Sequence, residues 1–474
     1  MKKLFFYGAI LTALVTGGCR KIVMDNNGSS NNGGDTTSNP GTENTILEGR
    51  ITANRTLKAG YTYKLRGLVY VTNGSILTIE PGTKIVGENG KNGGLIITRS
   101  CKIIADGTAD KPIVFTSESS TPKRGDWAGL VILGNAPTNS SFNGVAGVGE
   151  IEGGVNNSDG LGLYGTPATQ QQNPADNSGI LRYVRVEYAG YAFLPDKEIN
   201  GITFGGVGNQ TVVDYVEVAY ANDDSFEWFG GTVNCSHLIS YKTLDDDFDT
   251  DNGFSGKVQF GISLRDSSVA DISKSEAFES DNDANGSSNL PQTSAVFSNM
   301  TVIGPRETLA NTGNSLFVWG AQIRRNSSLS LFNSIIMGYP NGLYIDATKG
   351  VPTDNNIPGS LFVQNTFIAG CATPVLYSIS GNTNTPLVPN TTATITEWFN
   401  TASYGNKIFA TNPEVGLTAP FNYSAPDFNP ATGSAAATGA AFTHTKLATG
   451  FTSVAYVGAC AVGDTWWKNW TSFQ

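Results

Sequence analysis

Residues 215–256 carry nearly the same order of apolar and polar positions twice. The first copy reads YVEVAYANDDSFEWFGG from Tyr215, and the second reads LISYKTLDDDFDTDNGFSG from Leu238. Each copy has a short β-rich run, a cluster of Asp, a Phe followed by an acidic residue, and glycines; Phe226 and Phe248 are 22 residues apart. A strand-forming unit of this length cannot bury its apolar face alone and must stack on a neighbour. The repeat therefore predicts a β-solenoid.

The repeat also predicts which side chains lie together. If the two copies stack in register, Glu227 lies one strand spacing, about 4.8 Å, from Asp249. A third Phe–acid pair, Phe278–Glu279, follows 30 residues after Phe248. Because neighbours in a strand alternate faces, we expect one stack of Phe rings and one row of acids on the opposite side. Such carboxylates repel one another unless a cation, a proton or a hydrogen-bond donor lies between them.

Short apolar runs broken by Gly, Asn and Asp continue from Ile46 to the C-terminus, which predicts an all-β body over residues 46–474. The longest insertion, residues 138–177, is rich in Gly, Asn and Gln and is expected to form a surface loop. The Trp-rich segment Tyr456–Phe473 is predicted to cap the last coil, because terminal repeats are atypical.

Four motifs identify the kind of solenoid: PGT at Pro81–Thr83, AxGT within Ala105–Thr108, PIxFTS at Pro112–Ser117 and GDWxGLxIxGxA at Gly125–Ala136. They resemble the bacterial right-handed parallel β-helix proteins of the pectin-lyase-like superfamily. Ala321–Asp346 and the Trp-rich terminus are similar to sequence motifs that are repeated in secreted or lipid-anchored members of this superfamily, which are common in Bacteroidota. The resemblance implies a single-stranded right-handed parallel β-helix with loop insertions and a C-terminal Trp-rich cap. It implies a surface location but no established activity.

The N-terminus has the features of a bacterial lipoprotein signal. In MKKLFFYGAILTALVTGGC, a basic start and an apolar core too short to span a membrane precede Cys19, whose thiol would be lipidated. Thr16 departs from the usual lipobox, and the alternative is an ordinary secretory signal cut near Gly18. Residues 20–45 are polar and without apolar periodicity, as expected of a flexible tether. We therefore predict a body lipid-anchored to the outer membrane, at the cell surface.

Composition narrows the function classes. The net charge of −10 argues against nucleic-acid binding, which requires a basic surface. Beyond the lipobox, Cys101, Cys235, Cys371 and Cys460 are at least 89 residues apart and form no CxxC pair, which excludes a zinc ribbon. Buried free thiols are predicted for all four.

Two groups of oxygen ligands are candidates for a metal site. The first group comprises Asp223, Asp224, Glu227, Asp245, Asp246, Asp247, Asp249 and Asp251. The second comprises Glu279, Asp281, Asp283 and Asn285, of which the last three match the first half of a D-x-D-x-N-G calcium loop. Gln292 stands where that loop has its bidentate Glu. Oxygen-only clusters suit hard cations, most simply Ca²⁺. The alternative is a solvated row of turns in which Asp side chains accept from backbone amides.

Candidate catalytic groups are few. The Gly-His-Gly and Arg-x-Lys signatures of polygalacturonase-like β-helices are missing, and the only histidines are His237 and His444. A lyase would need a base such as Lys, Arg or His facing a Ca²⁺-bound uronate, and Arg265, Arg324 and Arg325 are conceivable groups. No catalytic residue is therefore assigned.

Binding residues have two interpretations each. Arg324 and Arg325 would contact a ligand or anchor loops by hydrogen bonds. Trp228 and Trp319 lie near coil turns and would stack on a sugar or pack in the core.

Together these features favour a non-catalytic cell-surface lipoprotein that presents a β-helix face to a glycan, another envelope protein or an outer-membrane receptor, with Ca²⁺ stabilising the acidic repeat. The alternative is a polysaccharide lyase or glycoside hydrolase on the same fold. The two differ in one feature, because an enzyme needs a groove with a basic residue opposite the acids.

Overall fold

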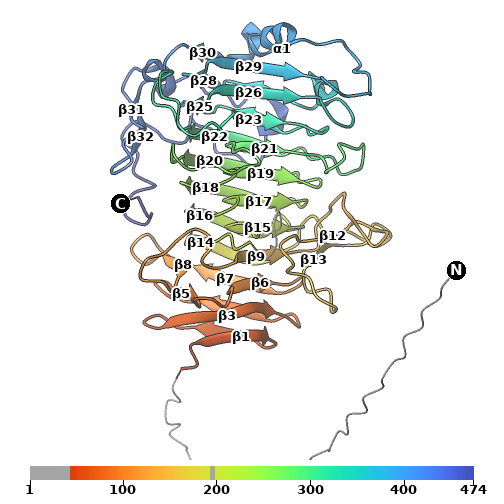
Figure 1. The fold of residues 1–474 in the computed structure, drawn as a ribbon, viewed down its shortest axis with the longest axis vertical. Coiled ribbons are helices and arrows are strands. Elements are labelled where there is room, and N and C mark those ends of the chain that lie inside the picture. The colour runs from red at the N-terminus through yellow and green to blue at the C-terminus, as the bar shows by residue number, and fades with distance from the viewer. Residues whose placement is uncertain (1–42, 193–197, 474) are drawn as a thin grey trace, which may run out of the picture. The chain divides into compact units, whose positions relative to one another are not determined.

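The computed structural model describes residues 43–192 and 198–473. Residues Asn44–Gln474 form one compact unit, and nearly all of its strands belong to one continuous parallel sheet. The sheet winds as a right-handed parallel β-helix, the hand that parallel crossovers adopt (Figure 1). The predicted fold is confirmed, and the predicted signal and all but the last residues of the predicted tether lie outside the described residues.

Each coil has three faces. Face one consists of β6 (Gly94–Ile97), β9 (Gly129–Leu133), β15 (Ile202–Gly205), β17 (Phe226–Phe229), β19 (Phe248–Asp251), β21 (Phe278–Ser280), β23 (Trp319–Ile323), β26 (Asn341–Asp346) and β29 (Thr373–Ser378). Face two contains β2 (Arg55–Leu57), β4 (Ile76–Ile79), β7 (Lys102–Asp106), β24 (Ser330–Phe332) and β27 (Val363–Gln364). Face three contains β5 (Lys84–Gly87), β8 (Ile113–Ser117), β25 (Ile335–Met337), β28 (Phe367–Ala369) and β30 (Lys407–Phe409).

Longer strands turn a corner and serve two faces. Faces two and three share β14 (Gly179–Glu187), β16 (Val212–Ala219), β18 (Asn234–Tyr241), β20 (Lys257–Leu264) and β22 (Val296–Ile303). Faces three and one share β1 (Ile46–Ile51) and β3 (Thr62–Val71).

The interior is built from ladders of like residues. Phe226, Phe248 and Phe278 are paired in register and fully buried. Their ring centroids are 5.9 Å apart for the first pair and 5.4 Å for the second, in stacked geometry. The stack predicted from the repeat is therefore confirmed. The cysteines Cys101, Cys235, Cys371 and Cys460 are free and buried, also as predicted.

A second ladder marks the corner between faces two and three. Its members all have positive φ: Tyr183, Tyr215, His237, Phe260, Asn299, Asn333 and Asn365. This conformation is unusual for aromatic residues and easier for Asn. Tyr215 stacks on Tyr183 at 4.5 Å and on His237 at 4.2 Å between ring centroids, so ring stacking accompanies the unusual backbone.

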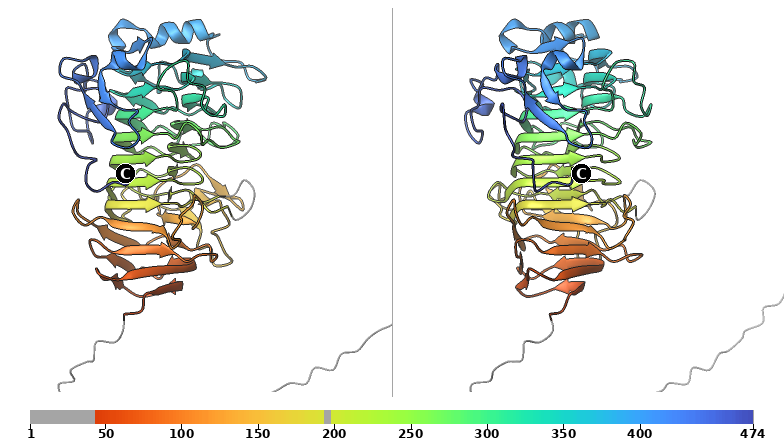
Figure 2. Two further views of the ribbon diagram at one scale, coloured as in Figure 1. Left: turned by 60° about the vertical axis from the view of Figure 1, so that its left-hand side comes forward. Right: turned by 90° about the vertical axis from the view of Figure 1, so that its left-hand side faces the viewer.

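The C-terminal segment follows this corner ladder and does not cap the last coil, which corrects the prediction. Trp470 meets Tyr183 edge-on at 5.6 Å, and Trp466 meets His237 at 5.0 Å. Asn299 Nδ2 donates to the Tyr456 carbonyl at 3.0 Å. Figure 2 shows the segment returning along the side of the solenoid toward earlier coils.

The last coil is instead covered by α1 (Thr392–Phe399), the only α-helix in the described part of the chain. Ile395 and Phe399 of α1 are buried against the core. Between α1 and β30 lies η2 (Ala402–Tyr404). The C-terminal segment is the part of the chain after β30, and it contains η3 (Asn412–Val415), β31 (Leu417–Ala419), β32 (Asp427–Pro430), η4 (Ala435–Ala437) and η5 (Thr445–Leu447). Earlier in the chain, η1 (Thr353–Asn356) follows β26. In the part of the chain described, no helix combines the length and apolar character needed to cross a bilayer.

The predicted insertion, residues 138–177, leaves the solenoid as a surface loop with two hairpins (Figure 1). They consist of β10 (Ser141–Phe142) with β11 (Val145–Ala146), and β12 (Val148–Glu150) with β13 (Leu163–Gly165). Asn139 Nδ2 donates to the Asn282 carbonyl at 2.8 Å, and Tyr164 packs on Phe229 at 6.0 Å between ring centroids. The loop thus lies beside the middle strands of face one.

The Phe stack makes a direct stability prediction. Phe248→Ala removes a ring buried between two others, and should lower the free energy of unfolding by about 3–5 kcal/mol. Urea denaturation followed by circular dichroism measures the change. Ile272→Ala, at a side chain that is 84% exposed, is the control and should be near neutral. An equal, small effect of both substitutions would contradict the packing.

Candidate functional site

The middle strands of face one carry carboxylates in register. β17, β19 and β21 pair Glu227 with Asp249 and Asp249 with Glu279. These residues follow the buried Phe of each strand, so they point to the outer side of the sheet. The predicted acidic row is therefore confirmed in its register.

Two further rows flank this one. The turns before the strands supply Asp224, Asp246 and Glu276, each two residues ahead of the aligned Phe. Beyond the strands, Asp251 is aligned with Asp281 by continuation of the same register. We call the three rows together the acidic face: Asp224, Asp246, Glu276, Glu227, Asp249, Glu279, Asp251 and Asp281.

Backbone amides explain part of the row that precedes the strands. The Asp246 N–H donates to Asp224 Oδ1 at 2.8 Å, and the Glu276 N–H donates to Asp246 Oδ1 at 2.6 Å. Each carboxylate therefore caps the turn of the next coil, as the turn-row alternative predicted. One oxygen of Asp224 and one of Asp246 are used in this way.

Three sets of carboxylates bring their oxygen atoms within 4.8 Å of one another. They are Asp223 with Asp224 and Asp245, Asp224 with Glu227 and Asp249, and Asp246 with Glu276 and Glu279. Half of the members are buried and the others are partly buried, which is expensive for charged groups that lack a counterion. The sets combine residues from adjacent coils, so the stacking of coils assembles them.

Burial shifts the protonation of these groups strongly. The pKa values of Asp224, Glu227 and Asp249 are raised well above their usual range, first by burial and then by neighbouring carboxylates. Burial, with the charge of Glu279, raises the pKa of Glu276 to about 8. The face thus holds protons at neutral pH unless a cation replaces them.

Two carboxylate oxygens of the three sets have no hydrogen-bond donor. Asp245 Oδ1 and Asp249 Oδ1 are buried and accept no hydrogen bond from any described residue. Glu227, by contrast, accepts from Asn200 Nδ2 of the preceding coil. A buried carboxylate oxygen without a donor is costly, and a bound cation would remove that cost.

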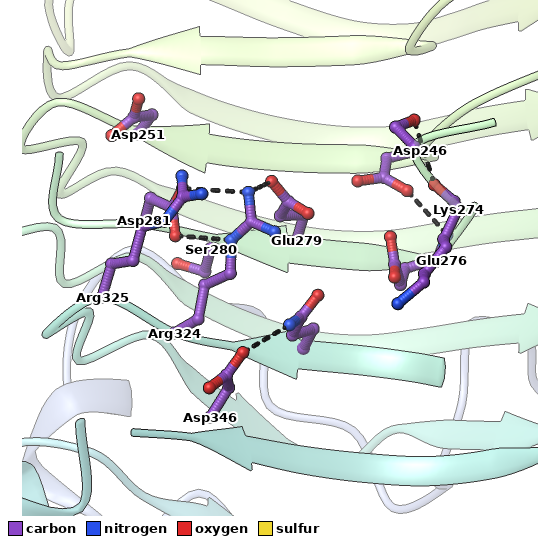
Figure 3. Close-up of polar contacts among 12 residues, drawn as sticks. Asp246, Asp251, Lys274, Glu276, Glu279, Ser280, Asp281, Arg324, Arg325 and Asp346 are labelled. Atoms are coloured by element: carbon purple, nitrogen blue, oxygen red, sulfur yellow. Dashed lines mark hydrogen bonds and ion pairs between the residues drawn. The ribbon is translucent and has the colours of Figure 1, made fainter. Parts of the chain in front are cut away.

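Two arginine side chains approach the outer row of the acidic face at Asp281. Figure 3 shows the guanidinium groups of Arg324 and Arg325 turned toward Asp281. Arg324 Nε donates to Asp281 Oδ1 at 2.8 Å, and its Nη2 also contacts Glu279. Arg325 Nη1 lies 2.5 Å from Asp281 Oδ2. These contacts match the predicted anchoring role, and the acids raise the pKa of Arg324, which therefore stays charged.

The prediction that Asp247 is a metal ligand is wrong. Its side chain is fully buried inside the solenoid, where Oδ1 accepts from Ser240 Oγ and lies 3.0 Å from Arg265 Nη1. Ser263 Oγ donates to its other oxygen. Asp247 is therefore neutralised internally, and the guanidinium of Arg265 is consumed by the same contact.

The partial calcium loop also has another explanation. Asp281 pairs with the two arginines, and Asp283 Oδ1 accepts from the backbone N–H groups of Asn285 at 2.9 Å and Ser287 at 3.1 Å. Asn285 itself is exposed. The structure therefore assigns these residues to an ion pair and an Asx turn, and they do not converge on one point.

The two tryptophans differ. Trp228 is fully buried between Phe204, Phe226 and Phe254, so it cannot stack on a ligand. Trp319 is half-buried and continues the row of Asp224, Asp246 and Glu276 by register. Its ring stacks on Tyr344 at 4.9 Å, and the Lys274 ammonium lies 4.7 Å from its centroid. Trp319 therefore borders the acidic face.

Glu276 and Asn200 are not among the site residues predicted from the sequence. Glu276 stands two residues before Phe278, the position that Asp224 occupies before Phe226, so aligning the third Phe–acid pair in full would have found it. Asn200 has no such signal, because its coil lacks the acidic motif.

The histidines do not serve this face. His237 belongs to the corner ladder between faces two and three, and Asp214 Oδ1 lies 2.8 Å from its Nδ1. His444 lies in the C-terminal segment against Phe362. Among the described residues, the acidic face therefore offers oxygen ligands and paired guanidinium groups but no neutral nitrogen base.

The raised pKa values predict how stability depends on pH in the absence of metal. Folded Glu276 titrates near pH 8, above its ordinary 4.5, so the folded state binds more protons between these values and stability falls as pH rises. Urea denaturation in EGTA should show a lower free energy of unfolding at pH 8 than at pH 5. Glu276→Gln should reduce the slope, and exposed Glu397→Gln should not. A flat or rising profile in the unmodified protein would contradict the prediction.

The family comparison agrees with this architecture. Residues 49–410 match the family model described as a pectate-lyase-like β-helix domain. No match was found among curated proteins or among solved structures. The matched range covers most of the solenoid, including every residue of the acidic face, and the chain belongs to the pectate-lyase-like β-helix domain family.

Proposed function

We propose that the protein is a non-catalytic, lipid-anchored surface protein whose acidic face binds Ca²⁺ and, with it, a glycan or an envelope protein. The observation that carries the proposal is Asp249. Its Oδ1 is buried without a donor, and one oxygen of its carboxylate lies within 4.8 Å of carboxylate oxygens of Asp224 and Glu227. Carboxylates alone, from a rigid scaffold, are the ligands Ca²⁺ prefers.

The arrangement around the face supports binding without turnover. Lyase chemistry requires a base that can lose its proton. Arg324 is held charged by Asp281 and Glu279, and the raised pKa of its guanidinium excludes that role in this arrangement. A Ca²⁺ ion bound to carboxylates of the sheet would leave coordination positions toward solvent for hydroxyl or carboxylate groups of a partner.

A glycoside hydrolase is the second candidate, because one observation favours it. The pKa of Glu276 is raised to about 8, and a carboxyl group that remains protonated at neutral pH is suited to be a general acid. Metal binding and acid catalysis make opposite demands on Glu276, since a metal ligand must be deprotonated.

The first test is the response of stability to Ca²⁺. One site at a hundredfold excess over Kd should add about 2.7 kcal/mol to the free energy of unfolding. The double variant Glu227→Gln with Asp249→Asn should abolish most of the rise in melting temperature caused by millimolar Ca²⁺. It should also be more stable than the unmodified protein in EGTA, because two buried groups that must either bind a proton or carry a charge are replaced by neutral amides.

Asp110→Asn with Glu397→Gln removes the same charge from exposed positions and is the matched control. Its Ca²⁺ response should equal that of the unmodified protein. Calorimetry without detectable Ca²⁺ binding, together with melting that is indifferent to chelator, would reject the metal site.

The second test separates binding from catalysis. The soluble body, from residue 46, is screened on a glycan array and against the same polysaccharides for depolymerisation, with and without Ca²⁺. Retention on an array without new reducing ends or unsaturated products is the expected result. Product formation that Glu276→Gln abolishes would establish the hydrolase instead.

The anchor has its own test. Labelled palmitate should be incorporated into the full chain and not into Cys19→Ala, which should leave the membrane fraction. Unchanged labelling and fractionation of Cys19→Ala would refute the lipid anchor and leave an ordinary secretory signal.

A further inference from the structure

A groove of about 520 Å³ lies away from the acidic face, where the C-terminal segment passes the start of the face-two strands. One wall contains Ser255, which precedes β20, together with Lys257 of β20 and Val296 of β22. The other contains Lys446 of η5 and Thr449. Its size is within the range of pockets that bind small molecules.

The lining has an unusual charge for this chain. It consists of Ser255, Lys257, Pro291, Gln292, Ser294, Val296, Ser328, Ser360, Thr445, Lys446 and Thr449. Two ammonium groups and many hydroxyl groups are present, and no carboxylate lines it. The chain as a whole has a net charge of −10, so the groove is a local reversal of sign. We call it the lysine groove.

Neutral oxygens hold both ammonium groups. Lys446 Nζ donates to Ser330 Oγ at 3.0 Å and to the Ser360 carbonyl. Lys257 Nζ donates to Thr449 Oγ1 at 2.9 Å and to the Thr449 carbonyl. In the described part of the chain neither ammonium forms an ion pair with a carboxylate. Because an ammonium has three N–H donors, each retains one for a further acceptor.

Burial makes this arrangement costly for Lys446. Its pKa is lowered to about 8 by burial alone, which reflects a charge removed from water without an opposite charge nearby. The neighbouring titratable group, His444, accepts the Lys446 backbone N–H at 3.2 Å and supplies no negative charge. An anion in the groove would provide the missing partner.

We propose that the lysine groove is an oxyanion-binding site, which takes a carboxylate, sulfate or phosphate group through Lys257 and Lys446. Ser255, Ser294 and Thr445, which carry hydroxyl groups, line the remaining space. Such groups suit the hydroxyls of a sugar that carries the anion. The site uses no residue of the acidic face, so it does not depend on the proposed function.

Calorimetric titration of the soluble body at pH 7 tests the proposal with glucuronate, inorganic sulfate, inorganic phosphate and neutral glucose. At least one anion should bind, and glucose should bind at least tenfold more weakly than glucuronate or not at all. Glucuronate tighter than both inorganic ions identifies an acidic sugar as the source, and the reverse order identifies a free anion. No anion binding at 10 mM, or glucose equal to the anions, would overturn the site.

Variants locate the binding. Lys446→Met should weaken anion binding at least tenfold, and Lys257→Met, which is less buried, provides a second variant if the first does not fold. Lys84→Met removes an exposed ammonium on β5 and should leave the affinity unchanged. A melting curve whose folded baseline matches that of the unmodified protein confirms that each variant is folded. Equal losses in all three variants would show a general charge effect and reject the groove.

Discussion

The register of stacked parallel strands is the constraint on which the rest of this protein depends. Each coil repeats the position of the one below at about 4.8 Å, so like positions in the sequence become neighbours in space. Inside, this gives the Phe226–Phe248–Phe278 stack, which stabilises the fold. On the outer side of the sheet, the same register places Glu227, Asp249 and Glu279 next to one another, and this proximity of acidic groups destabilises the fold. Both ladders follow from the same strand register, and a shift of that register would disrupt both.

This constraint explains why the β-helix could be predicted from the sequence and the course of the C-terminal segment could not. Repeat spacing and strand alternation contain the register, so the fold and the central acidic row follow from residues 215–256 and Phe278–Glu279. The course of the C-terminal segment depends on contacts between distant positions, such as Trp470 with Tyr183. No local pattern records such contacts. A Trp-rich terminus is equally consistent with a cap and with a strap along the corner.

Within the site, alternation alone did not decide the role of each acid. In the sequence DDDFDTD, Asp247 and Asp249 stand on either side of Phe248, yet one faces the interior and the other the outer surface. The difference arises because Asp247 lies in the turn before β19, where the chain bends and alternation no longer holds. Its partner, Arg265, comes from the end of β20, and only the three-dimensional corner brings them to 3.0 Å. The sequence therefore identifies the candidate acids but does not tell which of them face the interior and which face the outer surface.

The limits of the acidic face follow from the coils that adjoin it. In the central row, Thr203 precedes Glu227 and Gln322 follows Glu279, so carboxylates give way to uncharged groups at both ends. In the outer row, Arg324 follows Asp281 and neutralises it. A repeat that only needed to be soluble would not require buried carboxylates in three adjacent coils, because exposed ones serve that purpose at less cost. The concentration of neighbouring, largely buried carboxylates in the coils of β17, β19 and β21 is thus the feature that the proposed Ca²⁺ site would account for and surface solvation does not.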